Sequence, residues 1–425
     1  MTGVVVIGGG QAAFSVASTL RRTGYAGPVT ILAGERHLPY QRPPLSKKFL
    51  ADPGGTHVDL VPESYYRECD IDLRRGDEVV AVDPDGRTVT TRSGSRLGYD
   101  HLVFATGARN RGLPVPGHDL AGVHCLRSID DAREIGAALG RARDVVVIGG
   151  GFIGLELAQA AVARGARVTV VELADRLLAR ALSPHLAGHL RAQHERTGVQ
   201  ILTGTTVLAI EGAGPDFSPV KGGGGVVGRG VERVVTDIGS LPADLVLYGV
   251  GAAPRDELAR AAGLPVADGV LVDDHLRSIV DPSVSAVGDC ARHPHPLAAG
   301  LVRLESAQNA TDQGVLVGRR LAGRPGAYES LPWFFSDQGA IKLQIAGLRA
   351  DGDEIRVVAG DRPDRWGAYA FRAGSLVAVE TLNWPAEHLA ARRLLERRVP
   401  VSPAELTDTT LTALARVAST PAVTP

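Results

Sequence analysis

Hydrophobic and polar positions repeat in two blocks that share one design. A β-branched run, Val4–Ile7, enters three glycines and then a helical stretch that ends near Arg22. The same order returns at Val145–Ile148, where three glycines lead into a helical stretch that ends near Arg164. A strand, a glycine-rich turn and a helix in this order predict the start of a dinucleotide-binding fold. The repeat therefore predicts two such folds in one chain.

Each block continues into a second apolar run and then an acidic residue. The runs are Val29–Leu32, followed by Glu35, and Val168–Val171, followed by Glu172. This closes a βαβ unit, in which a carboxylate beyond the second strand can accept from a ribose hydroxyl. Further strands are expected at Glu78–Val82, Arg87–Arg92, Tyr99–Phe104, Asp244–Val250 and Val284–Val287.

The pattern changes to alternating strands from about Leu331. The expected strands are Ile341–Ile345, Ile355–Ala359, Trp366–Phe371 and Leu376–Leu382, followed by a helix over Pro385–Arg398. This predicts a separate α+β domain, with a frayed tail from Thr407 onward. The glycine-rich stretch Gly212–Gly230 is expected to be a flexible loop or a widened hairpin, and a functional lid is the less favoured alternative.

Composition and charge exclude several classes of function. The chain has 425 residues, with 46 Lys and Arg against 47 Asp and Glu, and a net charge of −1. Such a balance does not favour binding to nucleic acid or to an anionic membrane. No apolar run is long enough for a membrane span, and no signal peptide is recognisable, so a cytoplasmic protein is expected.

The cysteines are too dispersed for a shared site. Cys69, Cys125 and Cys290 form no close pair, which makes a disulfide framework, a zinc site or a dithiol redox centre improbable. No metal site is expected. Cys290 is expected to be a small buried residue, although it follows Asp289 directly.

The two glycine-rich turns supply the candidate chemistry. Gly8, Gly10 and Ala13 form the first fingerprint, and Gly149, Gly151 and Gly154 form the second. In such a turn the first glycine allows the tight bend, the second lets the backbone approach a pyrophosphate, and the third position must be small. Glu172 favours NADH, because its charge repels the 2′-phosphate of NADPH, but the nearby Arg167 and Arg176 leave NADPH open.

Two short motifs suggest that the first fold binds a flavin. Ala105, Thr106 and Gly107 follow a buried strand, where small residues let the backbone pass a flavin closely, and Asp289 ends another strand, where its carboxylate can accept from ribityl hydroxyls. The expected class is α/β, with two Rossmann-like domains of glutathione-reductase type and a C-terminal α+β domain. Residues 1–108 and 241–325 are expected to bind FAD, residues 109–240 to bind NAD, and residues 326–425 to form the third domain.

The chain resembles the bacterial FAD-dependent NADH:ferredoxin reductases of the putidaredoxin and rhodocoxin reductase type. The resemblance runs from residue 2 to about 407. Beyond the second glycine-rich turn, it is carried by the segments Leu38-Pro-Tyr-Gln-Arg-Pro-Pro-Leu-Ser-Lys47, Val287-Gly-Asp289, Arg303-Leu-Glu-Ser-Ala-Gln-Asn309, Pro332-Trp-Phe-Phe-Ser-Asp-Gln338 and Lys342-Leu-Gln-Ile-Ala-Gly347.

The resemblance implies roles for particular residues. Lys47 would lie beside the flavin and pair with Glu156, bracketing the place where nicotinamide stacks. The FAD would be lined by Ala12, Glu35, Arg42, Val80, Arg127, Asp289 and Val302. Ile153 and Gly251 complete the residues expected around NAD.

The resemblance also implies an activity and a partner. Electrons would pass from NADH through FAD to a [2Fe–2S] ferredoxin that feeds a cytochrome P450 or another oxygenase. Arg303, Arg349 and Trp333 are the candidates for docking an acidic ferredoxin. Two alternatives stay open: a flavoenzyme whose acceptor is O2 or a quinone, and a non-enzymatic role like that of the apoptosis-inducing factor relatives. The chain departs from the pattern at Ala307, Phe335, Gly339 and Arg255, which puts the identity of the partner in doubt.

Overall fold

The computed structural model describes residues 2–212, 230–406 and 410–417. The first sheet has the order β3-β2-β1-β6-β5-β4, with β18 beside β6. Strands β3, β2, β1, β6 and β18 run parallel, and β5 and β4 form an antiparallel extension. The bounds are β1 Gly3–Ile7, β2 Val29–Ala33, β3 Asp72–Arg75, β4 Val79–Asp83, β5 Thr88–Thr91, β6 Arg96–Phe104 and β18 Val284–Ala286.

Helices α1 (Gln11–Arg22) and α8 (Ala307–Leu321) pack against each other beside this sheet, although they lie almost 300 residues apart in the chain. Their backbones approach closely because α8 carries glycine at the contact. A Cβ on Gly314 would lie 2.7 Å from the carbonyl oxygen of Ala12. The remaining elements of this region are α3 Glu63–Glu68, α7 Glu257–Ala261, β17 Val270–Leu271, β19 Ala291–Pro294 and β20 Leu301–Val302.

The second sheet is wholly parallel, in the order β11-β10-β9-β15-β8. Its strands are β8 Val123–Cys125, β9 Asp144–Ile148, β10 Arg167–Glu172, β11 Val199–Thr203 and β15 Leu245–Tyr248, with helices α4 Ile129–Leu139, α5 Phe152–Val162 and α6 Pro184–Arg196. Both faces of a parallel sheet are buried, which explains why Val145–Ile148 is apolar throughout.

A three-stranded antiparallel sheet adjoins it, formed by β12 Val207–Gly212, β13 Val231–Thr236 and β14 Gly239–Pro242. Strands β12 and β13 pair up to Gly212 and Val231. The expected loop or hairpin between them falls on residues 213–229, which lie outside the described residues.

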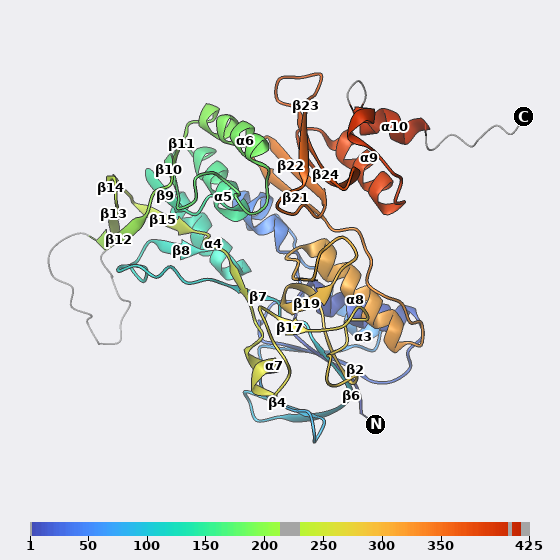
Figure 1. The fold of residues 1–425 in the computed structure, drawn as a ribbon. Coiled ribbons are helices and arrows are strands. Elements are labelled where there is room, and N and C mark those ends of the chain that lie inside the picture. Colours follow the sequence, from blue (N-terminus) through green and yellow to red (C-terminus); the bar gives the residue numbers. More distant parts are fainter. Residues whose placement is uncertain (1, 213–229, 407–409, 418–425) are drawn as a thin grey trace, which may run out of the picture.

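A two-stranded ribbon connects the first and second sheets. The chain leaves the first sheet through β7 (Ala108–Asn110) and returns through β16 (Ala252–Pro254), and the two strands pair antiparallel. In Figure 1 this ribbon lies at the waist between the two sheets. The expected border at residue 108 coincides with β7. The expected border at residue 241 falls inside β14, and because β15 still belongs to the second sheet, the chain returns to the first sheet only at β16.

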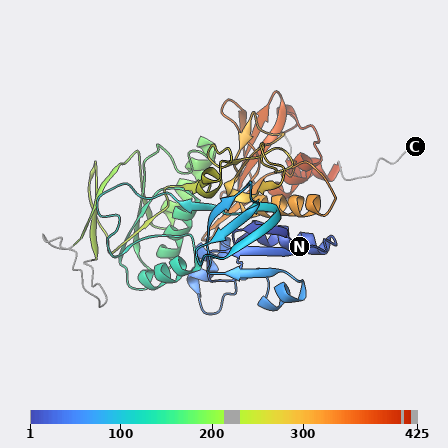
Figure 2. The ribbon, with the colours of Figure 1, turned by 90° about the horizontal axis from the view of Figure 1, so that it is seen from below.

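The C-terminal sheet is antiparallel, in the order β21-β22-β25-β24-β23. Its strands are β21 Trp333–Gln338, β22 Ile341–Gly347, β23 Glu354–Ala359, β24 Trp366–Arg372 and β25 Ser375–Leu382, followed by helix α9 Pro385–Glu396. Strand β21 was not among the strands expected from the sequence. Figures 1 and 2 show this sheet, in orange and red, beside the green helix α6.

The expectation of a frayed tail from Thr407 is wrong for residues 410–417. Helix α10 (Leu411–Val417) packs on α9, and Leu411 is fully buried. The buried carboxylate of Glu387 on α9 explains this order, because it accepts from the backbone N–H of Leu411 at 2.7 Å and of Thr412 at 3.0 Å. A carboxylate at a helix N-terminus satisfies donors that have no partner within the helix.

The C-terminal sheet is also bonded to the second sheet's helices through one carboxylate. Glu380 on β25 accepts from the backbone N–H of Ser183 at 2.9 Å and from its hydroxyl at 2.7 Å. Ser183 is the N-cap residue of α6. Burial raises the pKa of Glu380, and the bonds from Ser183 and Arg349 oppose that shift. A carboxylate from the C-terminal sheet therefore anchors Ser183, the residue directly before α6.

Among the residues with described positions, no helix is long and apolar enough to cross a membrane. The same part of the chain holds no group of three or more His, Cys, Asp or Glu side chains arranged to bind a metal ion.

Candidate functional site

One large cleft collects most of the residues singled out by the sequence. Its volume is about 3990 Å³, and both glycine-rich turns line it. Single ligand sites are usually about 300–1,000 Å³, so the cleft has room for two dinucleotides. Because the strands β1 and β9 are parallel members of their sheets, each ends at the cleft and delivers its turn there, as open α/β sheets do for ligands.

The first turn fits a pyrophosphate closely. Gly8 has φ of +124°, and a Cβ there would lie 2.1 Å from the carbonyl oxygen of Ala105, so only glycine is tolerated. At Gly10 a Cβ would meet no atom within 4 Å, which leaves open space in front of the backbone on the cleft side. Helix α1 begins next to it with no side-chain cap and no acid in its first turn. Its N–H groups are thus available to an anion.

The second turn repeats this arrangement. Gly149 has φ of +104°, and a Cβ there would lie 2.5 Å from the carbonyl oxygen of Gly249. Gly151 precedes α5, which also begins without a side-chain cap or an acid in its first turn. Ile153, which is 40% exposed, and Gly251 line the cleft beside this turn.

The third position of each fingerprint packs and does not line the cleft. Ala13 is fully buried, while its neighbour Ala12 lines the cleft. A Cβ on Gly154 would lie 2.1 Å from the carbonyl oxygen of Gly149. Both residues therefore serve the close approach of helix to strand that the motif requires.

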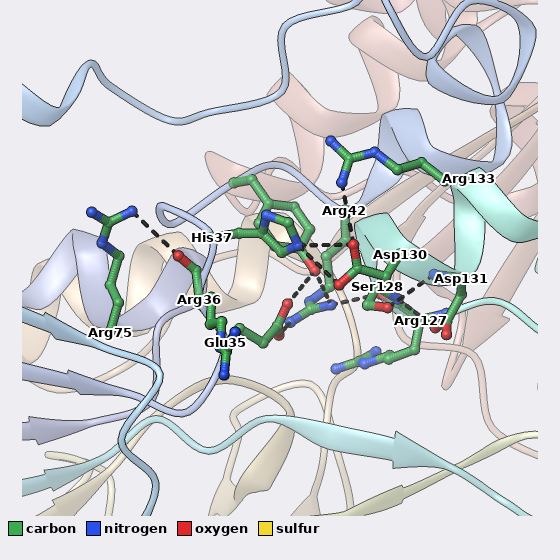
Figure 3. Close-up of polar contacts among 11 residues, drawn as sticks. Glu35, Arg36, His37, Arg42, Arg75, Arg127, Ser128, Asp130, Asp131 and Arg133 are labelled. Carbon is green, nitrogen blue, oxygen red and sulfur yellow. Dashed lines mark hydrogen bonds and ion pairs between the residues drawn. The ribbon is translucent and has the colours of Figure 1, made fainter. Parts of the chain in front are cut away.

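Glu35 holds the far end of the first site through an arginine. Its carboxylate accepts from Arg42 at 2.6 Å and from the hydroxyl of Tyr40 at 2.7 Å. Burial acts to raise the pKa of Glu35, but Arg42 and the bond from Tyr40 outweigh it, so the pKa is lowered. Arg42 also donates to the carbonyl of Arg127 at 2.6 Å (Figure 3). The sequence did not predict that the hydroxyl of Tyr40 takes part in this site.

A second contact bridges the same region. His37, two residues beyond Glu35, lies 3.0 Å from the carboxylate of Asp130 at the start of α4 (Figure 3). The hydrogen bond from His37 is the main cause of a lowered pKa at Asp130. Together with the Arg42 contact, this pair joins the segment after β2 to helix α4.

Asp289 and the residues after β6 line the centre of the first site. Asp289 is paired with Arg127 at 3.2 Å, and burial raises the pKa of Asp289 while Arg127 opposes the shift. Ala105, Thr106 and Gly107 line the cleft beside it, as does Val80, which is 46% exposed. A buried carboxylate with one cation and open space in front suits a ligand that carries hydroxyls.

Val302 is a flavin-site candidate that, like Ala13, does not line the cleft. It lies on β20, where its strand pairs with β19 at His293. Its neighbours Arg303 and Leu304 do line the cleft.

Glu172 lies at the cleft with both carboxylate oxygens engaged by backbone. They accept from the N–H of Gly150 at 2.6 Å and of Ala174 at 2.8 Å. The two arginines that could have favoured a 2′-phosphate have other partners: Arg167 pairs with Asp144 at 2.5 Å, and Arg176 pairs with Asp175 at 3.1 Å. Neither Arg167 nor Arg176 is therefore free to bind a 2′-phosphate beside Glu172.

Lys47 and Glu156 form the expected ion pair, with Nζ 2.9 Å from Oε1. Glu156 is 4% exposed, and its carboxylate also accepts from the hydroxyls of Ser336, at 2.6 Å, and of Ser46. Ser46 ends the 3₁₀ turn Pro43–Ser46, and α2 (Lys48–Ala51) follows Lys47 directly. The ammonium also lies 5.5 Å from the ring centre of Phe335.

Ser46 and Ser336 lie within segments that carry the family resemblance, but the sequence predicts no role for either. Nothing local in the sequence shows that Ser336 reaches Glu156, because 180 residues separate them. Only the pairing of β21 against α5 brings the two side chains together.

Two docking candidates are wrong. Arg303 has a side chain only 9% exposed and pairs with Asp268 and Glu305. Arg349 is bonded to the buried Glu380 at 3.3 Å. Arg303 is thus covered and paired with two exposed carboxylates, and Arg349 is paired with a buried one, so neither guanidinium is free for a partner.

Trp333 belongs instead to a stacked series of side chains at the mouth of the cleft. Its ring is stacked on Phe335 at 6.2 Å, and the guanidinium of Arg392 on α9 lies 4.1 Å from its ring centre. Phe335 is 38% exposed, and Leu389, one turn before Arg392, is 46% exposed. We call Trp333, Phe335, Leu389 and Arg392 the aromatic–arginine face.

The departures from the resembling pattern fit this geometry. Gly339 has φ of +64°, and a Cβ there would lie 2.9 Å from Oε1 of Gln159, so glycine suits the turn between β21 and β22. Ala307 and Arg255 both line the cleft. Cys290 is fully buried and burial raises the pKa of its thiol, as expected for a packing residue.

Comparisons with known proteins agree with this site. The sequence pattern of the pyridine nucleotide-disulphide oxidoreductase family matches residues 2–314, and that of the reductase C-terminal family matches residues 333–417. Rhodocoxin reductase from Rhodococcus erythropolis is 42% identical over 96% of this chain and 92% of its own length. Terpredoxin reductase from a Pseudomonas species is 39% identical over 95% of both chains.

Solved structures show the same likeness. The ferredoxin reductase for the CYP199A2 system from Rhodopseudomonas palustris superposes with a TM-score of 0.91 at 39% identity, over 98% of this chain and all of its own. Putidaredoxin reductase, in its covalent complex with putidaredoxin, superposes with a TM-score of 0.89 at 34% identity, over 98% of this chain and 99% of its own.

Proposed function

Because the chain belongs to the pyridine nucleotide-disulphide oxidoreductase family, whose members bind FAD and NAD(P)H, we propose that it is a flavoprotein NADH:ferredoxin reductase. Its acceptor is a [2Fe–2S] ferredoxin that feeds a cytochrome P450 or another oxygenase. The observation that carries the proposal is the Lys47–Glu156 pair, which lies in one cleft with both glycine-rich turns. The names of the similar reductases point to the same class of acceptor.

The residues divide between the two nucleotides according to their turns. FAD is bound by residues 1–108 and by the chain from β16 to residue 325, with its pyrophosphate at Gly8 and Gly10, its ribose hydroxyls at Glu35 and its ribityl hydroxyls at Asp289. NAD is bound by the second sheet and its helices, from residue 109 to the end of β15, with its pyrophosphate at Gly149 and Gly151 and its ribose at Glu172. Residues 326–425 form the third domain. The absence of a membrane-spanning helix in the described residues is compatible with a cytoplasmic location.

The chemistry of hydride and single-electron transfer is supplied by the bound flavin. The chain has to hold the nicotinamide against it, keep water out and fix charge nearby. Lys47 comes from the segment between the 3₁₀ turn and α2, Glu156 comes from α5, and each is held by the other, so together they fix charge beside the place of the reacting rings. Arg127 and Arg42 neutralise the carboxylates of the first site.

The aromatic–arginine face is the docking surface of this proposal. It combines Trp333 and Phe335 with Arg392, which also pairs with Glu396 at 3.5 Å. Three more arginines are exposed in or just after the last turn of α9, Arg393, Arg397 and Arg398, the last of which pairs with Glu329. A positive, partly apolar face next to the cleft suits an acidic protein that must bring its cluster near the flavin.

The test is stopped-flow mixing of the FAD-loaded protein with NADH, followed by cytochrome c reduction with and without a [2Fe–2S] ferredoxin. Rapid bleaching of the flavin and a cytochrome c rate that depends on ferredoxin support the proposal. Bleaching without any dependence on ferredoxin supports the small-acceptor alternative instead.

A further inference from the structure

A continuous series of hydrogen bonds lies behind the Lys47–Glu156 pair. Ser336 donates to Oε1 of Glu156 at 2.6 Å, and the amide of Gln338 donates to Ser336 at 3.1 Å. His194 on α6 lies 2.7 Å from Oε1 of Gln338, and Gln159 on α5 donates to Nδ1 of His194 at 2.8 Å. The series therefore starts and ends on α5 and passes through α6 and β21. We call Ser336, Gln338, His194 and Gln159 the relay residues.

Every hydrogen bond in the series points toward Glu156. An amide nitrogen can only donate, so Nδ1 of His194 accepts from Gln159, and its Nε2 carries the proton that goes to Gln338. Burial lowers the pKa of His194, which keeps the ring neutral in this tautomer. Because Gln338 occupies the acceptor side of the Ser336 hydroxyl, the single proton of that hydroxyl is committed to Glu156. Bonds aligned head to tail in this way strengthen one another.

The backbone places the two C-terminal residues for this task. Ser336 and Gln338 are two positions apart on β21, so their side chains share one face of the strand. Both are fully buried, whereas Phe335, which precedes Ser336 on the strand and lines the cleft, is 38% exposed. One strand therefore sets both the aromatic cover of Lys47 and the donor to Glu156.

We propose that Ser336 and Gln338 are positioning residues for the NADH reaction, which fix the carboxylate of Glu156 and through it the ammonium of Lys47. The proposal rests on the proposed function of the cleft. Oε1 of Glu156 receives both Ser336 and Lys47, so loss of the hydroxyl lets the carboxylate turn and moves the ammonium. Small displacements at a reacting centre slow the reaction more than they weaken binding.

The test compares variants by stopped-flow reduction at saturating NADH and by calorimetric binding of NAD⁺. Ser336→Ala is expected to lower the limiting rate about five- to tenfold, with NAD⁺ affinity changed less than twofold. Ser336→Thr, which keeps the hydroxyl, should restore most of the rate. Gln338→Leu should act in the same direction, and Ser336→Ala/Gln338→Leu should be no slower than Ser336→Ala, because Gln338 acts through Ser336.

Gln193→Ala is the matched control. Gln193 precedes His194 on the same helix and bonds to Asp364 and Asn383 across the same interface, but it does not belong to the relay residues. The limiting rate of flavin reduction in Gln193→Ala should equal that of the wild type. The proposal is overturned if Ser336→Ala keeps the wild-type rate, if Gln193→Ala loses as much, or if the double variant shows additive losses. A wild-type flavin that NADH does not bleach would overturn the proposed function itself, which separates the two failures.

Discussion

The ammonium of Lys47 lies 2.9 Å from the carboxylate of Glu156, although 109 positions separate the two residues. Lys47 follows the 3₁₀ turn Pro43–Ser46, whereas Glu156 lies on α5. Lys47 has a side chain 19% exposed and Glu156 one 3% exposed. A buried pair of this kind contributes through geometry more than through stability, because desolvation offsets much of the attraction.

Replacing Lys47 should therefore slow hydride transfer more than it weakens NADH binding. We expect Lys47→Ala to lower the limiting rate of flavin bleaching by about tenfold or more, since it leaves the carboxylate of Glu156 without its cation. Lys342→Ala, on the exposed side of β22, is the control and should be unaffected. If Lys47→Ala bleaches at the wild-type rate, the pair is only structural.

Glu172 should set the preference for NADH over NADPH. We expect the ratio of kcat/KM for NADH to that for NADPH to fall about tenfold or more in Glu172→Ala, because the like charge next to a 2′-phosphate is removed. Glu172→Gln keeps an acceptor for the N–H groups of Gly150 and Ala174, so it separates charge from turn structure. Equal efficiencies for the two nucleotides in the wild type would contradict the assignment.

Arg392 should matter for ferredoxin but not for a small acceptor. We expect Arg392→Ala to raise the KM for ferredoxin about fivefold at low salt, with ferricyanide reduction unchanged, because charged faces steer association. The effect should shrink with added salt as the Debye length falls below about 10 Å. Arg356→Ala removes an arginine from the C-terminal sheet, on β23, away from α9, and should have no effect.

Trp333→Ala tests the apolar part of the same face. We expect slower ferredoxin reduction with normal NADH oxidation by ferricyanide, because docking loses its aromatic contact while the cleft is kept. A parallel loss of both activities would mean that Trp333 supports the flavin site through Phe335 and not the partner.

His388 should make the folded protein sensitive to acid. Burial lowers the pKa of His388 to about 4, helped by Arg392, and neither ring nitrogen has a hydrogen-bond partner among the described residues. An unfolded histidine titrates near ~6.5, so the unfolded chain binds the proton first as the pH falls. Stability is therefore complete above about pH 6.5 and declines toward pH 4.

We expect His388→Leu to lose less stability than the wild type between pH 7.5 and pH 5, by on the order of 1 kcal/mol, in urea unfolding of the holoprotein. His185→Leu, an exposed position on α6, is the control. An identical decline in all three proteins would remove His388 from the acid response.

Local patterns predicted much of the fold and of the nucleotide site. The two glycine-rich turns lie where the strand–turn–helix repeat placed them, because a positive φ at Gly8 and Gly149 is a property of the turn itself. The strands of the C-terminal sheet were predicted too, except β21, whose aromatic residues followed by Ser336 and Gln338 do not show a simple alternation.

Contacts between distant segments explain what the sequence did not predict. Nothing in the sequence around Arg349 predicts that it pairs with Glu380, which lies on β25. Nothing around Leu411 predicts that helix α10 begins at the carboxylate of Glu387, 24 residues earlier. In the same way, His194 joins the site only through Gln338, 144 residues away. The hydrophobic periodicity of a helix or strand predicts which of its faces is buried, but it does not predict which polar group from another segment contacts that face.

The contact between Glu380 and Ser183 limits how such reductases can be recombined. A chimera that takes its C-terminal module from another reductase, in order to accept a different ferredoxin, would also replace the partner of Ser183. It would leave the buried N–H and hydroxyl of Ser183 without this acceptor unless the donor carries a carboxylate at the same place. A chimera that is meant to accept a different ferredoxin therefore needs the docking face and also the residues that bond the C-terminal sheet to the start of α6.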